Sequence, residues 1–290
     1  MEWINRHNVL IVGLGLMGGS YAAALKSIGY TVYAIDRDKA SIDFALENEI
    51  IDKGSVTNDE ALISEADCII LALYPAIVVD WVKDNQRFFK PGIRITDVTG
   101  IKSCVVYDIQ DLLREDCEFI AAHPMAGREL SGVKHSDPSI FKDANYIVVP
   151  TDKNTTDAAE WCANLGRILG FGRVSFLSPE EHDRMIAYVS QLTHCIAVAL
   201  MTCSDNEHIK DYTGDSFRDL TRIARINENM WAELFHMNKD ALLEEMNLFI
   251  GELTDIKDMI ENDDDEGLKA KMRLSTERRS KFDKKRRYEK

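Results

Sequence analysis

The sequence lacks the cysteine patterns that mark several classes of protein. Its six cysteines are scattered and include no Cys-x-x-Cys pair. This argues against a zinc ribbon, a redox dithiol and a disulfide framework. We expect reduced thiols and no metal site.

Long apolar runs are also missing. The longest, Cys68 to Val79, has 12 residues and is broken by Pro75, which is too short for a membrane-spanning helix. The first eight residues lack the apolar core of a signal peptide. We therefore expect a soluble, cytoplasmic protein with no membrane partner.

Positive charge is in deficit, with 35 Lys and Arg against 49 Asp and Glu and a net charge of -14. This field repels polyanions, so we expect no nucleic-acid partner, and a small anionic substrate would need a local cluster of cations. We interpret the acidic stretch 261–266 as a solvated helix junction. The basic stretch 278–290 is interleaved with acidic residues, which favours a solvated tail over a polyanion-binding one.

What the sequence does contain, from Asn8 to about Ser178, is an alternation of short β-branched runs with helix-length amphipathic segments. This alternation predicts an α/β fold with a doubly wound Rossmann sheet. Near-continuous apolar runs fit strands that are covered on both faces. The predicted strands are Val9–Val12, Thr31–Ile35, Cys68–Leu73, Ile93–Val98, Phe119–Ala122, Tyr146–Val149 and Arg173–Phe176.

The pattern changes at Ser178, where Ser-Pro-Glu-Glu predicts a capped helix start. Strand signals then stop, and apolar spacing predicts helices over about 179–206, 215–226, 229–261 and 264–286. We expect an α/β domain over residues 1–178 and an all-α domain over residues 179–290. The apolar surface of this short helical domain favours a homodimer, although burial within one chain is the alternative.

A glycine-rich turn, Gly13-Leu14-Gly15-Leu16-Met17-Gly18, directly follows the first predicted strand and opens a helix. Its glycines fall where a dinucleotide site needs a tight turn, a close approach of backbone to diphosphate, and close packing of helix on sheet. The helix N-terminus would offer N–H groups and a positive dipole end to the diphosphate. Alone the pattern is weak, because three glycines could merely make a turn.

Asp36 strengthens this interpretation, since it ends the second predicted strand, where a carboxylate can bind the adenosine ribose. It would also repel a 2′-phosphate, which favours NAD over NADP, whereas the adjacent Arg37 could welcome that phosphate. Leu73-Tyr74-Pro75 closes the strand that begins at Cys68, and we expect it to border the cofactor. Residues 1–178 are thus predicted to be an NAD-binding domain.

Two further segments, Asp97–Ser103 and Ala121–Glu129, lie at predicted strand ends and should project into the same crevice. A dehydrogenase that oxidises an alcohol needs a base within reach of the hydroxyl, and histidine has a suitable pKa. His123 ends a buried strand and is followed by Pro124. It is the leading candidate for this base, with a hydrogen-bonded structural histidine as the alternative.

Several ordered motifs resemble the prephenate dehydrogenase family, and they extend from Val9 to about Trp231. They are the glycine turn, the D-x-x-x-x-K pattern from Asp97 to Lys102, His-Pro-Met-Ala-Gly-Arg-Glu at 123–129, His182-Asp183 followed by Ser190-Gln-Leu-Thr-His194, and Phe217–Ala224 with Met230-Trp231.

The resemblance implies an NAD-dependent enzyme that converts prephenate to 4-hydroxyphenylpyruvate by oxidative decarboxylation, in tyrosine biosynthesis. It implies that His123 is the base and that Arg222 binds a substrate carboxylate. His194 and Glu129 would line the substrate pocket, with Trp231 nearby, contributed within the chain or across a homodimer. Tyrosine resembles the product, so it is a candidate inhibitor.

Other functions stay open at this point. Arogenate, the amino-acid analogue of prephenate, is the nearest alternative substrate. A β-hydroxyacid dehydrogenase with a helical second domain would oxidise without releasing CO2. A catalytically inactive dinucleotide-binding regulator is favoured by one departure from the family pattern, where Gly100 replaces a serine. Thr99, which we count as substrate-binding, or Ser103 could supply the hydroxyl instead.

Helical spacing gives mixed support to these assignments. Ser190 and His194 share a helix face, whereas His182 is displaced from His194 by about a third of a turn and is interpreted as structural. Spacing alone predicts a solvated face for Arg218, Arg222 and Arg225. Only the resemblance singles out Arg222, whose guanidinium can clamp a carboxylate with two hydrogen bonds.

Overall fold

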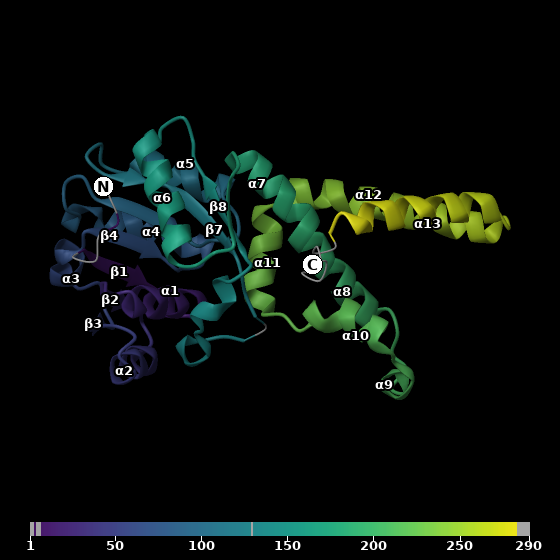
Figure 1. Ribbon diagram of the computed structural model, residues 1–290, viewed down its shortest axis with the longest axis horizontal. Helices are drawn as coiled ribbons and strands as arrows, with labels where there is room; N and C mark the ends of the chain where they lie inside the picture. Colours follow the sequence, from purple (N-terminus) through teal and green to yellow (C-terminus); the bar gives the residue numbers. More distant parts are fainter. Residues whose placement is uncertain (1–2, 4–6, 129, 283–290) are drawn as a thin grey trace, which may run out of the picture. The chain divides into compact units, whose positions relative to one another are not determined.

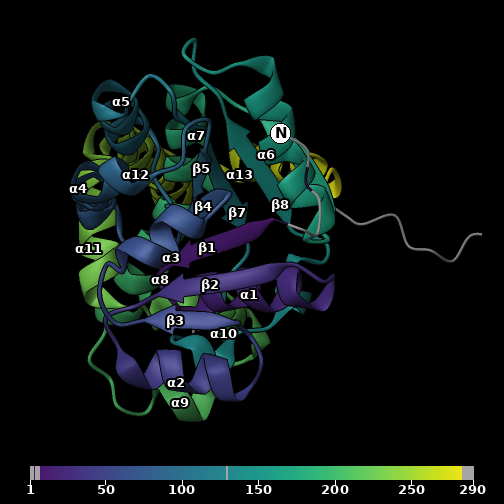
Figure 2. The ribbon, with the colours of Figure 1, turned by 90° about the vertical axis from the view of Figure 1, so that its left-hand side faces the viewer.

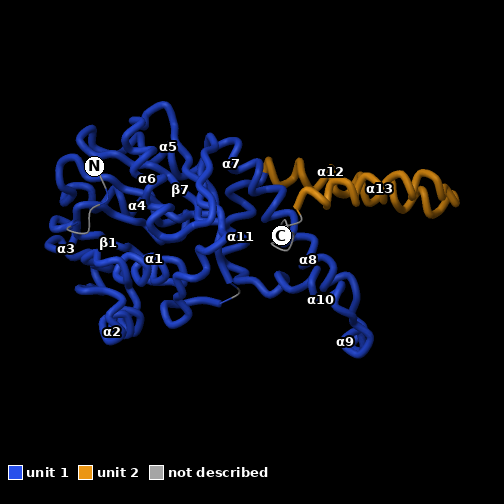
Figure 3. Tube along the Cα trace, viewed as in Figure 1, with its two compact units in different colours: residues 1–239 blue, residues 240–290 orange. Residues whose placement is uncertain are grey.

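The structure, a computed structural model, describes Trp3 and residues 7–128 and 130–282. Glu129, predicted to line the substrate pocket, lies outside the described residues. Contacts divide the chain into two compact units, residues 1–239 and 240–290 (Figure 3). Each unit is described by itself.

A parallel six-stranded sheet forms the centre of the first unit, with strand order β3-β2-β1-β4-β5-β6 (Figure 2). The chain builds the sheet outward from β1 to β3 and then crosses back to place β4 on the other side of β1. A dinucleotide fold binds its ligand where the strand order reverses in this way. The strands are β1 (Asn8–Val12), β2 (Thr31–Ile35), β3 (Lys53–Ser55), β4 (Cys68–Leu71), β5 (Arg94–Asp97) and β6 (Glu118–Phe119).

Successive residues of β1 point to opposite faces of the sheet, as the pleat of a strand requires. Val9 and Ile11 belong to the core under α1, α2 and α6, whereas Leu10 and Val12 belong to the core under α3, α4 and α5. Helices therefore cover both faces, which explains the near-continuous apolar strands. They are α1 (Leu16–Ser27), α2 (Lys39–Glu47), α3 (Glu60–Glu65), α4 (Pro75–Asn85), α5 (Ser103–Leu112) and α6 (Thr156–Ile168).

A second sheet holds the last three strands, β7 (Ala121–Met125), β8 (Asn145–Val149) and β9 (Arg173–Phe176). Here β7 and β8 are antiparallel, and β8 and β9 are parallel. The predicted strand Phe119–Ala122 is therefore wrong as one element, because the chain changes sheets at Ile120. Pro124, which has no N–H to donate, lies on β7 at the edge of this sheet, where a proline is tolerated.

After β9 the first unit continues only as helices among its described residues, so the expected order of a Rossmann domain followed by helices is confirmed (Figure 1). Ser178 makes the predicted capping box with Glu181. The helices are α7 (Pro179–Ile186), a π-helical segment (Ala187–Leu192), α8 (Thr193–Thr202), α9 (Ile209–Tyr212), α10 (Asp215–Thr221), a 3₁₀ turn (Arg222–Ala224) and α11 (Glu228–Met237).

The predicted helix over 229–261 is interrupted at Asn238, which ends α11 before α12 (Lys239–Glu261) begins. Asn238 is 7% exposed, and its amide donates to the Asp183 carbonyl and to Gln191 Oε1, both at 2.8 Å. The Asn238 side chain thus ties this helix end to two buried acceptors on the α7–α8 helix.

The second unit contains most of α12 together with α13 (Asp265–Ser280). Lys271 of α13 pairs with Glu252 and Asp255 of α12, at 3.0 and 3.2 Å, so the two helices form a hairpin. Asp264 caps α13, which confirms the predicted helix junction in the acidic stretch. Leu253, Ile256 and Ile260 form an apolar row on α12 that this unit leaves exposed.

One helix among the described residues, Pro179–Thr202, is long and apolar enough to cross a membrane by length and composition. Only 28% of its most apolar window is buried. Polar residues in the same helix, including His182, Asp183 and Gln191, are buried and hydrogen-bonded to the rest of the first unit. These contacts attach the helix to the rest of the first unit.

Candidate active site

The glycine turn between β1 and α1 leaves no room for side chains at two of its positions. Gly13 has a φ of +97°, and a Cβ there would lie 2.4 Å from the Ala72 carbonyl oxygen. A Cβ on Gly18 would lie 1.9 Å from the carbonyl oxygen of Gly13. Both contacts are far below van der Waals distance, so the turn and its packing on β4 require glycine.

Gly15 differs from these two, because a Cβ there would meet nothing within 4 Å. It is exposed and is the N-cap residue of α1, and no described side chain caps this helix end. No acidic residue occurs in the first turn. Open space at an uncapped helix N-terminus is what the diphosphate of a dinucleotide requires, so this cradle fits the predicted cofactor.

The Asp36 carboxylate lies at the end of β2 beside this turn. Its two oxygens accept the N–H of Leu14 at 2.5 Å and the N–H of Asp38 at 2.8 Å. Asp36 thus fastens the glycine turn to β2 and is half-buried, with further acceptor capacity for ribose hydroxyls. Arg37 is exposed at the same edge.

The remaining predicted cofactor residues border the same turn. Leu73 lies against it, with its Cδ2 3.3 Å from the position of a Cβ on Gly13. Tyr74 is the N-cap of α4 and Pro75 is its first residue. Within the turn, Leu14 is buried and Leu16 and Met17 are half-buried. All of these residues lie at the carboxyl edge of β1 and β4.

His123 lies on β7 and contacts a second histidine that spacing alone led us to interpret as structural. His123 Nδ1 is 2.8 Å from His182 Nε2. His182 Nδ1 is in turn 2.7 Å from Asp183 Oδ1. His182 is fully buried and His123 is half-buried, so His123 is the more accessible of the two histidines.

The Asp183 carboxylate is fixed by the start of α5. It accepts the N–H of Lys102 and the N–H of Ser103, both at 2.8 Å. Burial alone would raise the pKa of Asp183, but its hydrogen bonds with His182 and Ser103 bring that pKa below the usual range. Asp183 is therefore an ionised acceptor for His182.

Lys102 and Asp97 form a fully buried ion pair at 2.6 Å behind these histidines. Asp97 also accepts the N–H of Ala122 at 3.1 Å, which ties β5 to β7 one residue before His123. Burial lowers the pKa of Lys102, and the Asp97 carboxylate beside it acts in the opposite direction. Polar contacts thus run in a closed ring from Asp97 through Lys102, Asp183, His182 and β7 back to Asp97.

Burial favours the neutral form of both histidines. Burial, His182 and the Lys102 ammonium together hold the pKa of His123 well below its ordinary value of 6.5. Burial is also the main cause of the lowered pKa of His182, which its hydrogen bond to Asp183 only partly offsets. A neutral imidazole can accept a proton, so His123 has the protonation state that a general base requires.

The hydroxyl of Thr99, which we predicted to bind substrate, is buried. Thr99 is 3% exposed, and its hydroxyl contacts Asp97, the Ile101 carbonyl at 2.9 Å and Lys102 Nζ at 3.1 Å. The Thr99 hydroxyl already makes these hydrogen bonds beside the Asp97–Lys102 ion pair. This arrangement does not support Thr99 as a substrate contact. At Gly100, where the family has serine, a Cβ would lie 3.5 Å from Leu234.

Helix α11 lies against loops at the carboxyl edge of the parallel sheet. Its Glu233 carboxylate accepts the N–H of Ala76 at the start of α4, at 2.7 Å, and its Leu234 faces Gly100 after β5. The same helix carries Trp231, which packs against His194 of α8 with ring centroids 3.7 Å apart and the ring planes tilted by 30°. The structure thus brings these two predicted substrate residues together beside the nucleotide edge.

The π-helical segment before α8 sets the position of His194. The Ser190 carbonyl in this segment accepts a hydrogen bond from His194 Nδ1 at 2.8 Å and from the Thr193 hydroxyl at 2.7 Å. A π-helical segment changes the helical phase, and such segments are frequent at functional sites. Regular α-helical spacing therefore could not give the true relation between His182 and His194.

Arg222 lies in the 3₁₀ turn that follows α10, and its side chain is exposed. This turn packs against α8, the helix that carries His194. The predicted helical face of Arg218, Arg222 and Arg225 is wrong beyond Thr221, because α10 ends there and Arg225 is extended. All three arginines are exposed, as the predicted solvated face requires.

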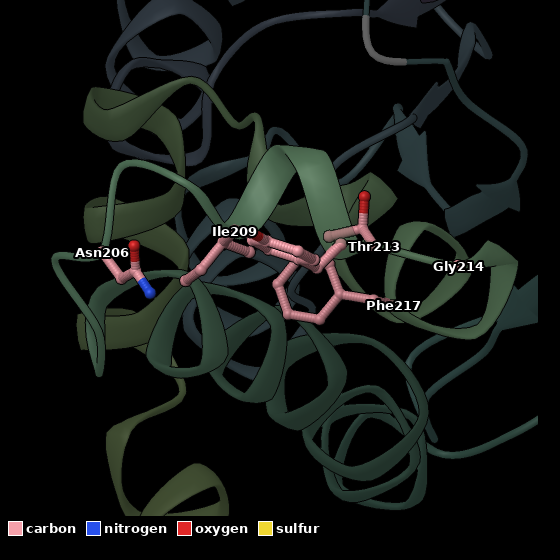
Figure 4. A pocket seen from close by; sticks show the side chains of 6 residues that line it. Asn206, Ile209, Thr213, Gly214 and Phe217 are labelled. Carbon is pink, nitrogen blue, oxygen red and sulfur yellow. The ribbon is translucent and has the colours of Figure 1, made fainter.

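A pocket elsewhere in the helical part contains none of the predicted site residues. Figure 4 shows its lining side chains from the loop before α9, from α9 itself and from α10. They are Asn206, Ile209, Tyr212, Thr213, Gly214 and Phe217. Tyr212 is 86% exposed, so this is an open surface hollow.

The fold and the site together define a class of protein. A glycine turn at the switch point of a parallel sheet, an acid at the end of β2 and a neutral histidine near the same edge are the features of a dinucleotide-dependent oxidoreductase.

Comparison with known proteins narrows this class. Residues 21–170 match the prephenate dehydrogenase nucleotide-binding domain, and residues 178–274 match the prephenate dehydrogenase dimerization domain. Prephenate dehydrogenase from Bacillus subtilis strain 168 is 30% identical over 270 residues, which cover 91% of this chain and 72% of that one. Cyclohexadienyl dehydrogenase from Zymomonas mobilis is 28% identical, covering 93% and 97%.

A crystal structure of prephenate dehydrogenase from Aquifex aeolicus, in complex with hydroxyphenyl propionate and NAD+, is similar over 97% of this chain and all of that chain. Its TM-score is 0.89 and its sequence identity 28%. The chain described here belongs to the prephenate dehydrogenase family, which confirms the resemblance seen in its motifs.

The two matched domains meet between residues 170 and 178, whereas contacts divide the chain after Lys239. The contacts described above explain the difference, because Asp183 and Glu233 bind α7 and α11 firmly to α5 and α4. The expected functional boundary at Ser178 stays a prediction.

Proposed function

We propose that this protein is an NAD-dependent prephenate dehydrogenase that makes 4-hydroxyphenylpyruvate for tyrosine biosynthesis. The observation that carries the proposal is the family match over both domains, with His123 held neutral near the nucleotide edge. The Aquifex aeolicus relative, which binds NAD+ and a hydroxyphenyl ligand, supports the same conclusion.

The cofactor would lie along the glycine turn, with its diphosphate over Gly15 and its adenosine ribose beside Asp36. NAD+ supplies the acceptor for a hydride from the carbinol carbon of the substrate. The Asp36 carboxylate would disfavour the extra phosphate of NADP, so we expect NAD to be preferred in spite of Arg37.

His123 would accept the proton of the ring hydroxyl as hydride leaves, because removing that proton makes hydride departure easier. Arg222 would bind a carboxylate of prephenate, and His194 and Trp231 would form a wall of the pocket. Glu129 remains a predicted pocket residue. Loss of the ring carboxylate as CO2 aromatises the ring, so the protein mainly has to orient the reactants.

A side-by-side assay tests this proposal. Prephenate and arogenate are each supplied with NAD+ or NADP+, and reduced cofactor, CO2 and the aromatic product are measured together. We expect equal amounts of NADH and CO2 from prephenate. Preference for arogenate would make the protein an arogenate dehydrogenase. Oxidation without release of CO2 would indicate β-hydroxyacid chemistry. Cofactor binding without turnover would indicate an inactive regulator.

We also propose that the protein is a soluble, cytoplasmic homodimer that associates through its helical domain. The match to a dimerization domain over residues 178–274 supports this, as does the apolar surface that the helices leave exposed. Inhibition by tyrosine remains a proposal, which adding tyrosine to the prephenate assay tests directly.

A further inference from the structure

The contacts of Asp183 determine where one hydrogen must lie. Both of its oxygens accept backbone N–H groups, from Lys102 and Ser103. An ionised carboxylate has no hydrogen to donate, so the contact of Oδ1 with His182 Nδ1 at 2.7 Å requires the hydrogen on that nitrogen. Asp183 therefore assigns one of the two neutral forms to His182.

The hydrogen on His182 in turn determines the hydrogen position on His123. His182 is fully buried and neutral, so with a hydrogen on Nδ1 its Nε2 carries a lone pair. This Nε2 lies 2.8 Å from His123 Nδ1, which must then carry the hydrogen of their hydrogen bond. Neutral His123 is left with its lone pair on Nε2.

We propose that Asp183 and His182 are positioning residues that fix the tautomer of His123, so that Nε2 is the nitrogen that accepts a proton. The inference deepens the proposed function and rests on it for the identity of the reaction. The tautomer itself is a property of the chain without substrate.

Three charged groups around the histidines favour this arrangement. Lys102 approaches from α5, Asp97 from β5, and Asp183 from α7. The Lys102 ammonium opposes a second proton on either histidine, while the N–H groups at the start of α5 keep Asp183 ionised. Without the His182 acceptor, nothing in the ring would hold the His123 hydrogen on Nδ1, and a hydrogen on Nε2 would block the base.

Nitrogen NMR of histidine side chains tests the proposal on the full-length protein. The two ring nitrogens of a neutral histidine give distinct long-range ¹⁵N signals, and the His123 signals are assigned by their loss in His123→Asn. We expect wild-type His123 to carry its hydrogen on Nδ1. A hydrogen on Nε2 in the folded wild-type protein would overturn the proposal without any variant.

The matched variant is His182→Asn, whose amide can still donate to Asp183 but is too short to accept from His123. We expect the Nε2-protonated form of His123 to appear and kcat to fall by up to about 10⁴-fold, the loss that a wrong histidine tautomer causes in a serine protease. NAD affinity should stay unchanged. Glu180→Gln, an exposed change on the same helix, is the control.

Retention of the wild-type tautomer and of full kcat in folded His182→Asn would refute the positioning role. If His182→Asn does not fold, His182→Leu is measured in the same way, since it too removes the acceptor. Lack of any turnover of prephenate by the wild-type protein, together with the expected tautomer, would refute the proposed function and leave this inference standing.

Discussion

At the scale of single residues, the three glycines of the nucleotide turn have different reasons to be glycine. A Cβ on Gly18 would collide with the Gly13 carbonyl, whereas a Cβ on Gly15 would enter open space. The sequence pattern predicted these separate roles, close packing of helix on sheet for one glycine and approach to the diphosphate for another. Stability and cofactor binding can therefore be separated within one motif.

Substituting Gly15 or Gly18 by alanine gives a paired prediction. We expect Gly18→Ala to lower the free energy of unfolding by about 1–3 kcal/mol, the range for strain and overpacking of this kind. Gly15→Ala should leave that free energy nearly unchanged, because its φ of -75° suits alanine, yet weaken NAD binding by intruding on the diphosphate. Chemical denaturation and cofactor titration check both. Equal effects of the two variants on stability would contradict this account.

At the scale of elements, β7 and α7 meet through the two histidines. Both histidines have pKa values below the ordinary 6.5 in the folded chain, so the unfolded chain binds protons first as pH falls. Their contribution to stability is complete above about pH 6.5 and is lost as pH falls below it, by up to about 1.4 kcal/mol per pH unit for each histidine. Asp183 acts in a separate window, below its ordinary value of 3.8.

Denaturant unfolding between pH 5 and pH 7 tests this linkage. The slope of unfolding free energy against pH should be shallower in His182→Gln, which lacks one of the titrating groups, than in the wild-type protein and in Glu180→Gln. Identical slopes in all three proteins would mean that His182 is not held neutral by the fold.

Most strands and the nucleotide turn could be predicted from local sequence pattern, but two features of the sheets could not. The β-branched runs gave the central strands and the glycine motif gave the nucleotide turn. The edge strand Lys53–Ser55 was not predicted because it has no apolar run. The change of sheet at Ile120 was not predicted because periodicity does not show which strands pair.

The histidine pair illustrates the same limit at the site. His123 was recognisable at the end of a buried strand, but its contact with His182 joins residues 59 positions apart. The π-helical segment then changed the phase on which His182 was interpreted as structural. Arg222 required the family resemblance, because three arginines at helical spacing look like a solvated face.

For the whole molecule, association through the helices is the main expectation. Leu253 and Ile260 lie on one face of α12 and are 56% and 62% exposed, so within its own unit this face has no cover among the described residues. We expect the protein to sediment as twice its 32.9 kDa chain mass at micromolar concentration. An aspartate at each of these two positions should weaken the dimer at least about tenfold, because charge would be buried.

The control for this experiment is Ile28→Asp, an equally drastic change at the end of α1 in the nucleotide half, where 44% of the side chain is exposed. It should leave the dimer intact. A wild-type protein that sediments as a monomer would refute the dimer. A double variant that dimerises as strongly as the wild type would refute association through this face of α12.

The central claim is that His123 is the proton acceptor of an NAD-dependent dehydrogenase. The most direct test is the turnover of prephenate by His123→Asn, measured beside the affinities of the same variant for prephenate and NAD+. The account predicts that kcat falls by about 10²–10⁴-fold while both affinities stay close to wild type. Near-normal turnover by a variant that binds both ligands normally would contradict it.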